Sequence, residues 1–361
     1  MADGTTTARI TGVHATSALG RGAAAQLAGV LAGTPAFGPV HRFDTTGRRV
    51  DRAATRTDVG SLADELADAV DAACVDAALT GPDRRTAALL LAVHGGPAAG
   101  PLAAELAVRT GIGGLRRVYT SACVSASSAL ADAATLIRRG DLTRVVVAAG
   151  YLVEPDQYAL FDAGRALATD GAVRPFSTGR TGLLLGDAVA AVVLESPAVA
   201  RHRVADLLGW GRAGDAFHAC RPHPDGVGLA RAVEAALRRA GLPAAALGYV
   251  NANATGTGFS DASEANALRA ALGTVADRIP VSSTKALHGH ALEASGLLEL
   301  VVTVLALQHG KLPVNAGYLG PDPACPLDVI LDAPRPATSP YALSLNAAFG
   351  GANTALLVGA A

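Results

Sequence analysis

Three runs of apolar residues limit the fold of this chain more than any other feature. They are TAALLLAVHGG at 86–96, RVVVAAG at 144–150 and AVAAVVLES at 188–196. A strand without polar alternation is buried on both faces, which is typical of a sheet that carries helices on each side. Half of the 361 residues are hydrophobic and only 17% are charged, so the chain can bury such a sheet. These features predict the α/β class.

Helices and further strands alternate with these runs. The clearest helix is 61–79, where apolar positions recur at three- and four-residue spacing behind the capping residue Ser61. We expect loops at 35–60 and 155–180. The other expected elements are strands 8–13, 116–122, 247–252, 278–283 and 341–347, and helices 123–138, 227–240, 261–272 and 290–309.

The alternation of strands and helices expected in the first half of the chain recurs in the second half. The two longest apolar helices have similar ends, TLIRRGDL at 135–142 and LALQHGKL at 305–312, each with a glycine at the stop. This similarity predicts one supersecondary unit used twice. We therefore expect an N-terminal half over residues 1–200 and a C-terminal half over residues 201–361.

Charge and hydropathy exclude several function classes. The formal net charge is −1, so no global field attracts nucleic acid or an anionic membrane. No apolar run of transmembrane length is free of Gly, Pro or charge, and residues 1–9 lack the apolar core of a signal peptide. We expect a cytoplasmic protein that binds neither nucleic acid nor membrane.

The cysteine pattern argues against structural bridges and metal sites. The four cysteines are far apart and form no CxxC pair, so neither a disulfide framework nor structural zinc is expected. His218, Cys220 and His223 have spacing that a metal accepts but lack a fourth ligand, so we expect no metal. TGTG at 255–258 lacks the spacing of a dinucleotide site, and no GxxxxGK[ST] occurs. No tightly bound cofactor is predicted.

Cys123 is the candidate nucleophile. It stands where strand 116–122 gives way to helix 123–138, and free N–H groups and the positive end of the helix dipole favour a thiolate there. Small neighbours such as Ser121 and Ala126 leave room for a substrate carbonyl. The alternative is a buried structural cysteine. Polar side chains close to Cys123 would distinguish a nucleophile from a structural residue.

Two later stretches supply such partners. YVNANATGTGFSDASEA at 249–265 and SSTKALHGHALEASG at 282–296 each run from a strand through a polar turn into a helix, and the second carries Lys285 and His290. Cys123 occupies the same topological place. Because open α/β sheets bind ligands at the carboxyl ends of their strands, we expect one shared site.

In family order, these motifs resemble the β-ketoacyl synthases of fatty acid and polyketide assembly, within the thiolase superfamily. The motifs that carry the resemblance are SALG at 17–20, SACVSAS at 121–127, the stretch 163–196, residues 223–242, the two stretches above, KLPVN at 311–315 and AAFGGAN at 347–353. The resemblance implies a thiolase fold with two similar βαβαβ halves that form a five-layered αβαβα core. It also implies a dimer, and acyl groups delivered on the phosphopantetheine arm of an acyl carrier protein.

The resemblance assigns a role to each matching residue. Cys123 matches the acyl-accepting nucleophile and His290 the second catalytic histidine, which can donate a hydrogen bond to the enolate. Lys285 matches the lysine that supports this histidine. The remaining matches are Thr255 and Thr257, which hold the pantetheine arm, and Phe349, the gate of the glycine-rich loop. The N–H groups of Cys123 and Phe349 can form an oxyanion hole.

The chain departs from the family pattern at several positions. Asn253 stands where the family has its first catalytic histidine, and Ala254 replaces the following glycine. An amide can donate a hydrogen bond to an enolate but cannot exchange a proton near neutral pH. Losing a general acid or base typically costs roughly 10²–10⁴-fold in rate. The segment before Cys123 is also short for the family, and Leu345 and Ala347 alter the loop before Phe349.

Four functions remain open at this point. The first is decarboxylative Claisen condensation through a Cys123 acyl-enzyme, in polyketide or fatty acid biosynthesis. The alternatives are a chain-length-factor-like subunit of a ketosynthase heterodimer, acyl transfer to an alcohol or amine without decarboxylation, and a scaffold without turnover. The expected partners are an acyl carrier protein and, in a homodimer or heterodimer, a ketosynthase-like subunit. We expect His288 at the pocket rim, and solvated arginines at 138, 139 and 144.

Overall fold

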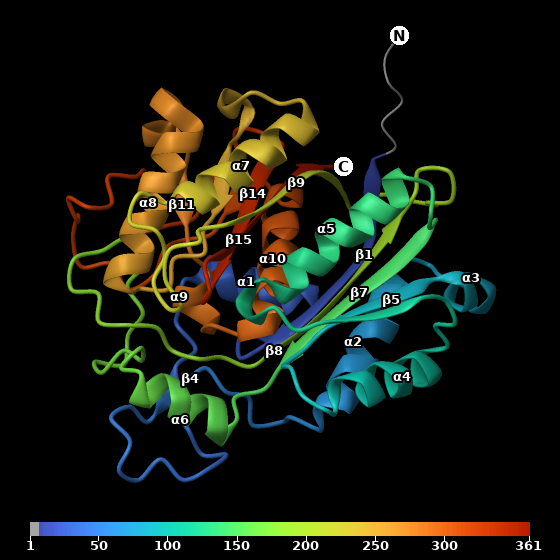
Figure 1. Ribbon diagram of the computed structural model, residues 1–361, viewed down its shortest axis with the longest axis horizontal. Helices are drawn as coiled ribbons and strands as arrows, with labels where there is room; N and C mark the ends of the chain where they lie inside the picture. Colours follow the sequence, from blue (N-terminus) through green and yellow to red (C-terminus); the bar gives the residue numbers. More distant parts are fainter. Residues whose placement is uncertain (1–6) are drawn as a thin grey trace.

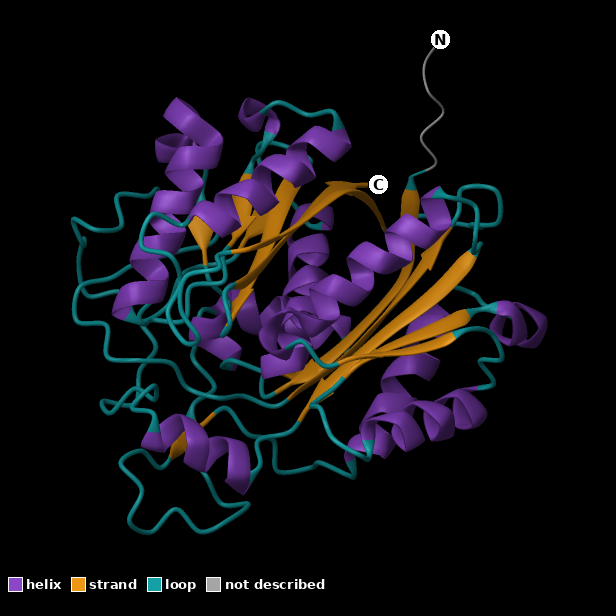
Figure 2. Cartoon of the chain, in the orientation of Figure 1, coloured by secondary structure: helices purple, strands orange, loops and turns teal. Residues whose placement is uncertain are grey.

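Strands and helices are stacked in five layers (Figures 1 and 2). A computed structural model describes residues 7–361. Helices α5 (Ser125–Arg138) and α10 (Ser295–Gln308) form the central layer and contact strands on both sides. Helices α2 (Leu62–Asp76) and α4 (Ala99–Thr110) cover one outer face. On the opposite outer face lie α7 (Val227–Ala240) and α8 (Gly258–Leu272), so the expected αβαβα arrangement is confirmed.

Two sets of five strands have the same order. The first set runs β6–β5–β7–β8–β1 and the second β11–β10–β14–β15–β9. The bounds are β1 Ala8–Ser17, β5 Ala88–Ala92, β6 Arg116–Tyr119, β7 Arg144–Tyr151, β8 Ala188–Glu195, β9 Ala205–Gly214, β10 Tyr249–Asn251, β11 Val281–Ser282, β14 Tyr341–Ala348 and β15 Ala352–Ala360. Pairing of β1 with β9 joins the sets into one eleven-stranded sheet that includes β2. The division at residue 200 stays a prediction.

Shorter elements connect these layers. They are β2 Gly20–Arg21, α1 Ala23–Ala32, β3 Gly38–Pro39, β4 Arg52–Ala53, α3 Gly81–Thr86, α6 Pro155–Ala163, α9 Lys285–His288, β12 Lys311–Leu312 and β13 Arg335–Pro336, with 3₁₀ turns at Ala122–Val124, Ala244–Ala246, Gly273–Arg278 and Leu292–Ala294. No helix within residues 7–361 is long and apolar enough to cross a bilayer. Residues 1–6 of the stretch 1–9 lie outside the described residues.

Two expectations about local structure are wrong. Helix α6 lies in the stretch 155–180 that we expected to be a loop. Its polar and apolar residues are not segregated, and Pro155 at the helix start and the buried Tyr158 stabilise it instead. The expected helix 290–309 starts only at Ser295, because residues 292–294 form a 3₁₀ turn. His290 therefore lies before the helix.

Candidate active site

Cys123 and His290 lie in contact at the centre of the molecule. The Cys123 Sγ is 3.1 Å from the His290 Nε2, and both side chains are buried. Cys123 sits in the 3₁₀ turn that joins β6 to α5, and His290 follows α9. The fold therefore brings together two residues that are 167 positions apart, as the strand-end expectation requires.

Strained and closely packed backbone holds the two residues. Ala122, just before the cysteine, has φ +50°, a left-handed conformation that is uncommon for alanine. The strand pairing of Leu185 with His290 fixes the histidine from the other side. Gly186 makes this approach possible, because a Cβ atom there would lie 2.0 Å from the His288 carbonyl oxygen. Segments of the first half thus hold the cysteine and pack directly against the backbone of His290.

Burial sets the protonation of the pair. It raises the pKa of the Cys123 thiol to about 12, and the charge of Glu293 acts in the same direction against Lys285. Burial also lowers the pKa of His290 well below its usual value, helped by Lys285 and His288. Both shifts favour a neutral thiol beside a neutral imidazole. Desolvation thus opposes the thiolate that the start of the helix favours.

Ser295, which sequence reasoning missed, contacts the far side of the imidazole. Its Oγ is 2.8 Å from His290 Nδ1 and accepts a hydrogen bond from the Ala291 N–H at 3.0 Å. If the Oγ also accepts from Nδ1–H, then Nε2 is free to accept the thiol proton. The sequence signal that could have identified this contact is a hydroxyl residue, Ser295, at the first position of an apolar helix.

Lys285 is buried behind the pair and is paired with Glu299. The Nζ lies 2.6 Å from Glu299 Oε1, and the Asn346 Nδ2 donates to Glu299 Oε2 at 2.7 Å. All three side chains are buried. Glu299 is another residue that we missed, although a single acid within SGLLELVVTVLALQ is a recognisable signal. The ion pair fixes a positive charge near His290.

Asn253 presents a donor to the site. Its Oδ1 accepts a hydrogen bond from the Ala347 N–H at 3.1 Å, which determines the orientation of the amide because a backbone N–H can only donate. The Nδ2 group is therefore the end of the side chain left for the cavity that Asn253 lines. The backbone N–H of Asn253 donates to Glu264 Oε1 at 2.8 Å, and burial raises the pKa of Glu264 to about 8.

One cavity of about 370 Å³ contains nearly all of the expected site residues. Its lining includes Cys123, His290, Asn253, Thr255, Thr257 and Phe349. The hydroxyls of Thr255 and Thr257 lie 3.2 Å apart along its wall. Lys285 is the one expected site residue that does not line the cavity. The space can admit a narrow chain that ends at the Cys123 thiol.

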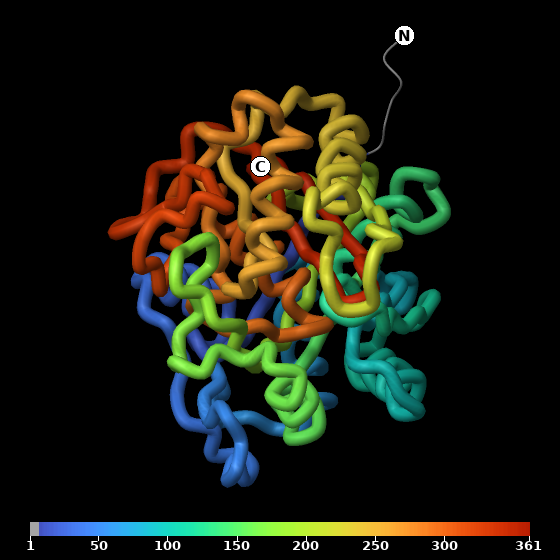
Figure 3. Tube along the Cα trace, turned by 60° about the vertical axis from the view of Figure 1, so that its left-hand side comes forward, coloured from blue at the N-terminus to red at the C-terminus, as the bar shows by residue number. Residues whose placement is uncertain are grey.

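Phe349 lies on the turn between β14 and β15, beside a second loop. Its side chain is 54% exposed and stacks on Phe161 with the ring centroids 5.9 Å apart. The Gly350 N–H donates to the Ala219 carbonyl, and the Asp215 N–H to the Gly351 carbonyl. Figure 3 shows the loop around residue 219 running beside this turn. The Phe349 ring therefore contacts both the buried Phe161 and solvent.

Several other candidates lie elsewhere. The expected rim position of His288 is wrong: α9 turns its ring into the core, where Nδ1–H donates to the Gly289 carbonyl at 2.8 Å. The His218 Nδ1 accepts a hydrogen bond from the Cys220 N–H, so this nitrogen is not free to bind a metal ion. Among residues 7–361, no group of three or more His, Cys, Asp or Glu side chains is arranged around a metal position. Arg144 is not solvated as expected, because Glu195 and Asp83 pair with it.

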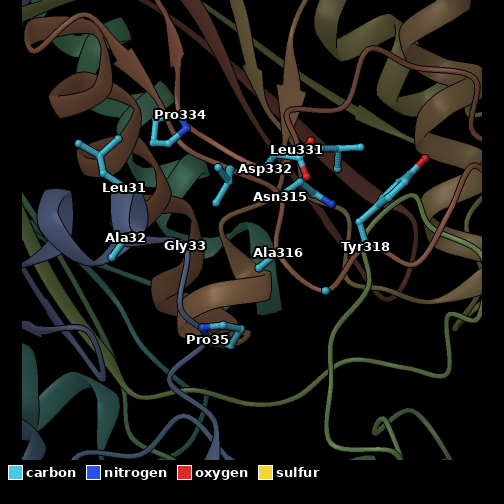
Figure 4. Close-up of a pocket in the computed structure, with 12 residues that line it drawn as sticks. Leu31, Ala32, Gly33, Pro35, Asn315, Ala316, Tyr318, Leu331, Asp332 and Pro334 are labelled. Carbon is cyan, nitrogen blue, oxygen red and sulfur yellow. The ribbon is translucent and has the colours of Figure 1, made fainter.

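A second cavity of about 320 Å³ lies at the end of α1 (Figure 4). It is bordered by Gly33 and Pro35 on one side, and by Tyr318 and Asp332 on the other. None of the expected site residues lines it. The chemistry is therefore to be sought in the Cys123 cavity.

Comparison with protein families gives two matches along the chain. The profile of the β-ketoacyl synthase N-terminal domain matches residues 83–200, and that of the C-terminal domain matches residues 204–318. Among curated proteins, the chain is 32% identical over 264 residues to 3-oxoacyl-[acyl-carrier-protein] synthase 2 of Staphylococcus aureus. The match covers 70% of this chain and 65% of that protein, so the chain spans just under two thirds of its length.

Two solved structures are similar over nearly the whole chain. The ishigamide ketosynthase/chain length factor superposes with a TM-score of 0.92 and 26% identity, covering 99% of both chains. A ketosynthase in complex with its chain length factor from Xenorhabdus doucetiae superposes with a TM-score of 0.84 and 25% identity, covering 99% of this chain and 98% of that one.

Proposed function

Because the chain belongs to the β-ketoacyl synthase family and has its thiolase fold, we propose that it condenses acyl thioesters carried on acyl carrier protein. The reaction is a decarboxylative Claisen condensation that lengthens the acyl chain by two carbons, in polyketide or fatty acid synthesis. The observation that carries this proposal is the 3.1 Å contact between Cys123 and His290 inside a cavity.

The first step loads the acyl group onto Cys123. His290 Nε2 takes the thiol proton as the sulfur attacks the thioester carbonyl, so neither residue needs to be charged beforehand. The N–H groups of Cys123 and Phe349 stabilise the resulting oxyanion. When the intermediate collapses, the carbon–sulfur bond to the pantetheine breaks, and the leaving thiolate takes the proton from His290.

The second step extends the chain. The malonyl carboxylate leaves as carbon dioxide, and the electron pair of the broken bond forms an enolate on the thioester. For this step the single imidazole proton must lie on Nε2, with Nδ1 accepting a hydrogen bond from the Ser295 hydroxyl. Asn253 Nδ2 and His290 Nε2–H then donate to the enolate oxygen, and the enolate carbon attacks the acyl-Cys123 carbonyl. The released Cys123 thiolate takes up a proton from solvent, which balances the negative charge that the malonyl carboxylate brought in. In this scheme Asn253 acts only as a donor, which agrees with the hydrogen bond from the Ala347 N–H to its Oδ1.

The substrate arm and the partners follow from the same proposal. The phosphopantetheine arm of the carrier protein passes Thr255 and Thr257, whose hydroxyls face each other across 3.2 Å. The arm is part of the substrate, so the protein itself needs no tightly bound cofactor. Phe349 lines the cavity and gates this path, and a second ketosynthase-like subunit completes a dimer.

A chain-length-factor-like role is the second candidate. Asn253 in place of the histidine favours it, as does the similarity to two ketosynthase and chain length factor assemblies. In that role the chain shapes the acyl tunnel of a complete partner synthase and is not itself acylated. Against it stand the Cys123–His290 contact and the buried Lys285–Glu299 ion pair, which a subunit without turnover does not need.

Intact-mass analysis with acyl and malonyl carrier proteins separates the two roles. We expect an acyl adduct on the wild-type chain that is absent from Cys123→Ala, followed by a product longer by two carbons. An adduct without extension would support acyl transfer alone. An adduct found only on an added partner synthase would refute condensation by this chain and support the chain-length role.

A further inference from the structure

The condensing cycle consumes one proton at the Cys123 sulfur. The thiolate released by condensation lies beside the new β-ketone and can add back to it until it is protonated. His290 cannot carry this proton in from solvent, because its ring is buried and its nitrogens contact the Cys123 sulfur and the Ser295 hydroxyl. The pantetheine arm of the product fills the cavity at this moment. A second route to the sulfur would complete the cycle.

Glu293 occupies a place in the second repeat that matches the place of the nucleophile in the first. It is the middle residue of the 3₁₀ turn Leu292–Ala294, which leads into α10 as the turn with Cys123 leads into α5. Each turn begins with a left-handed residue, Ala122 with φ +50° and Leu292 with φ +41°. The two turns contact each other. The fold therefore places a carboxylate next to the turn that carries the thiol.

The charge of Glu293 acts on the Cys123 sulfur. Burial has the largest effect on the raised pKa of this thiol, and the Glu293 carboxylate is the next cause, ahead of the opposing charge of Lys285. The Glu293 side chain is only 5% exposed, and its Oε2 has no hydrogen-bond partner within residues 7–361. A buried polar atom without a partner is costly, and such atoms are found at catalytic positions.

His94 connects this carboxylate to the surface. Its Nδ1 lies 3.0 Å from Glu293 Oε1, although the two residues are 199 positions apart. The His94 side chain follows β5 and is 57% exposed, so its imidazole can exchange protons with solvent. Within residues 7–361, no other basic side chain forms an ion pair with Glu293. The two side chains thus extend from solvent to the turn beside Cys123.

Tyr151 borders the same carboxylate. Its hydroxyl, at the end of β7, is buried and has no hydrogen-bond partner in the described part of the chain. Burial raises the pKa of this phenol and the Glu293 charge adds to the effect, so Tyr151 stays a neutral donor. A hydroxyl and a carboxylate can together hold one water molecule. Such a water would bridge any gap between Glu293 and the sulfur.

We propose that His94 and Glu293 form a proton relay that protonates the Cys123 thiolate after each condensation. Solvent gives a proton to His94 Nε2, and the proton on Nδ1 passes to the Glu293 carboxylate. The carboxyl group turns and gives this proton to the sulfur, directly or through one water. Glu293 is then ionised again, and turning of the exposed His94 ring restores the starting state. The relay rests on the proposed function, because condensation releases the thiolate.

Chemical rescue tests the relay. In His94→Ala, single-turnover acylation of Cys123 should match the wild type, since loading uses only the proton exchanged with His290. Multiple-turnover condensation should fall by about 10²-fold, the usual effect of losing a general acid. Imidazole added to the buffer should restore most of this rate in His94→Ala, but none of it in Glu293→Gln. His202→Ala removes another exposed histidine and is the matched control, which should change neither rate.

Two outcomes of these rate measurements would overturn the relay. One is a multiple-turnover rate of His94→Ala equal to that of the wild type. The other is a slow rate that added imidazole does not restore, because that result would show a purely structural role for the side chain.

Alkylation gives a measurement that needs no condensation. Glu293→Gln removes the negative charge beside the sulfur, so iodoacetamide should label Cys123 faster than in the wild type at the same pH. The exposed Cys220 is the internal reference. Unchanged labelling would overturn the relay, because Glu293 would then lie too far from the thiolate. A wild type that makes no extended product refutes the proposed function instead, so the two failures are distinguishable.

Discussion

The Nδ1 atom of His290 lies 2.8 Å from the Ser295 hydroxyl oxygen, on the side of the ring opposite Cys123. This contact can select the imidazole tautomer that accepts the thiol proton. Ser295→Ala should therefore lower the rate of Cys123 acylation by about fivefold, since one hydrogen bond contributes roughly 1 kcal/mol. The measurement is single-turnover acyl transfer over a range of pH.

Ser295→Thr provides the matched control for this positioning role. The threonine retains the hydroxyl and should recover most of the acylation rate and the wild-type pH profile. If Ser295→Ala and Ser295→Thr react equally, the hydroxyl does not orient the imidazole.

Breaking the buried ion pair should destabilise the protein. Glu299→Gln leaves the Lys285 ammonium, 1% exposed, without its carboxylate. Removing one partner of a buried pair typically costs about 3–5 kcal/mol. Denaturant unfolding should show this loss in the free energy of unfolding. The double variant Lys285→Met/Glu299→Leu should recover much of it; equal instability of the single and double variants would contradict this explanation.

The raised pKa of Cys123 predicts slow alkylation near neutral pH. A thiol with a pKa of about 12 has little thiolate at pH 7, and that fraction grows tenfold with each pH unit up to about pH 11. Iodoacetamide labelling of Cys123, followed by peptide mass, should rise over this whole range. Cys220 is exposed and serves as the internal control. A labelling rate that levels off near pH 7 would show a stabilised thiolate instead.

Restoring the imidazole at position 253 tests the departure from the family. Asn253→His should speed malonyl decarboxylation by about 10²-fold if proton transfer limits this step. Asn253→Asp should slow it, because the carboxylate cannot donate to the enolate oxygen. Carbon dioxide release from malonyl carrier protein is the measurement. Equal rates in all three proteins would mean that position 253 does not face the reacting group.

Much of the site was predictable because its residues follow strand ends. Cys123 and Asn253 follow strands β6 and β10 within a few residues, and His290 follows β11 after the short helix α9. Strand ends on one side of a layered sheet converge. The partners within the core were not predictable in this way. Glu299 meets Lys285, and Asn346 meets Glu299 from a position 47 residues away, through packing that no local pattern records.

The protonation of Cys123 also required the folded structure. Its local sequence contains the helix start, which stabilises a thiolate, but not the packing that removes water from the sulfur. The same limit applies to α6, where burial of Tyr158, not amphipathic spacing, stabilises the helix. In both cases tertiary packing outweighed the local signal.

The close approach at Gly186 has a consequence for how this chain can be divided. Because Gly186 has no side chain, a segment of the first repeat packs directly against the backbone that carries His290. The Cys123 thiol and the His290 imidazole come from opposite repeats and meet at the interface between them. A chain cut between the repeats would yield two fragments that each hold an incomplete dyad. The Cys123 thiol would become reactive again only when the two fragments reassemble at this interface. A bulky residue at position 186 should prevent that reassembly.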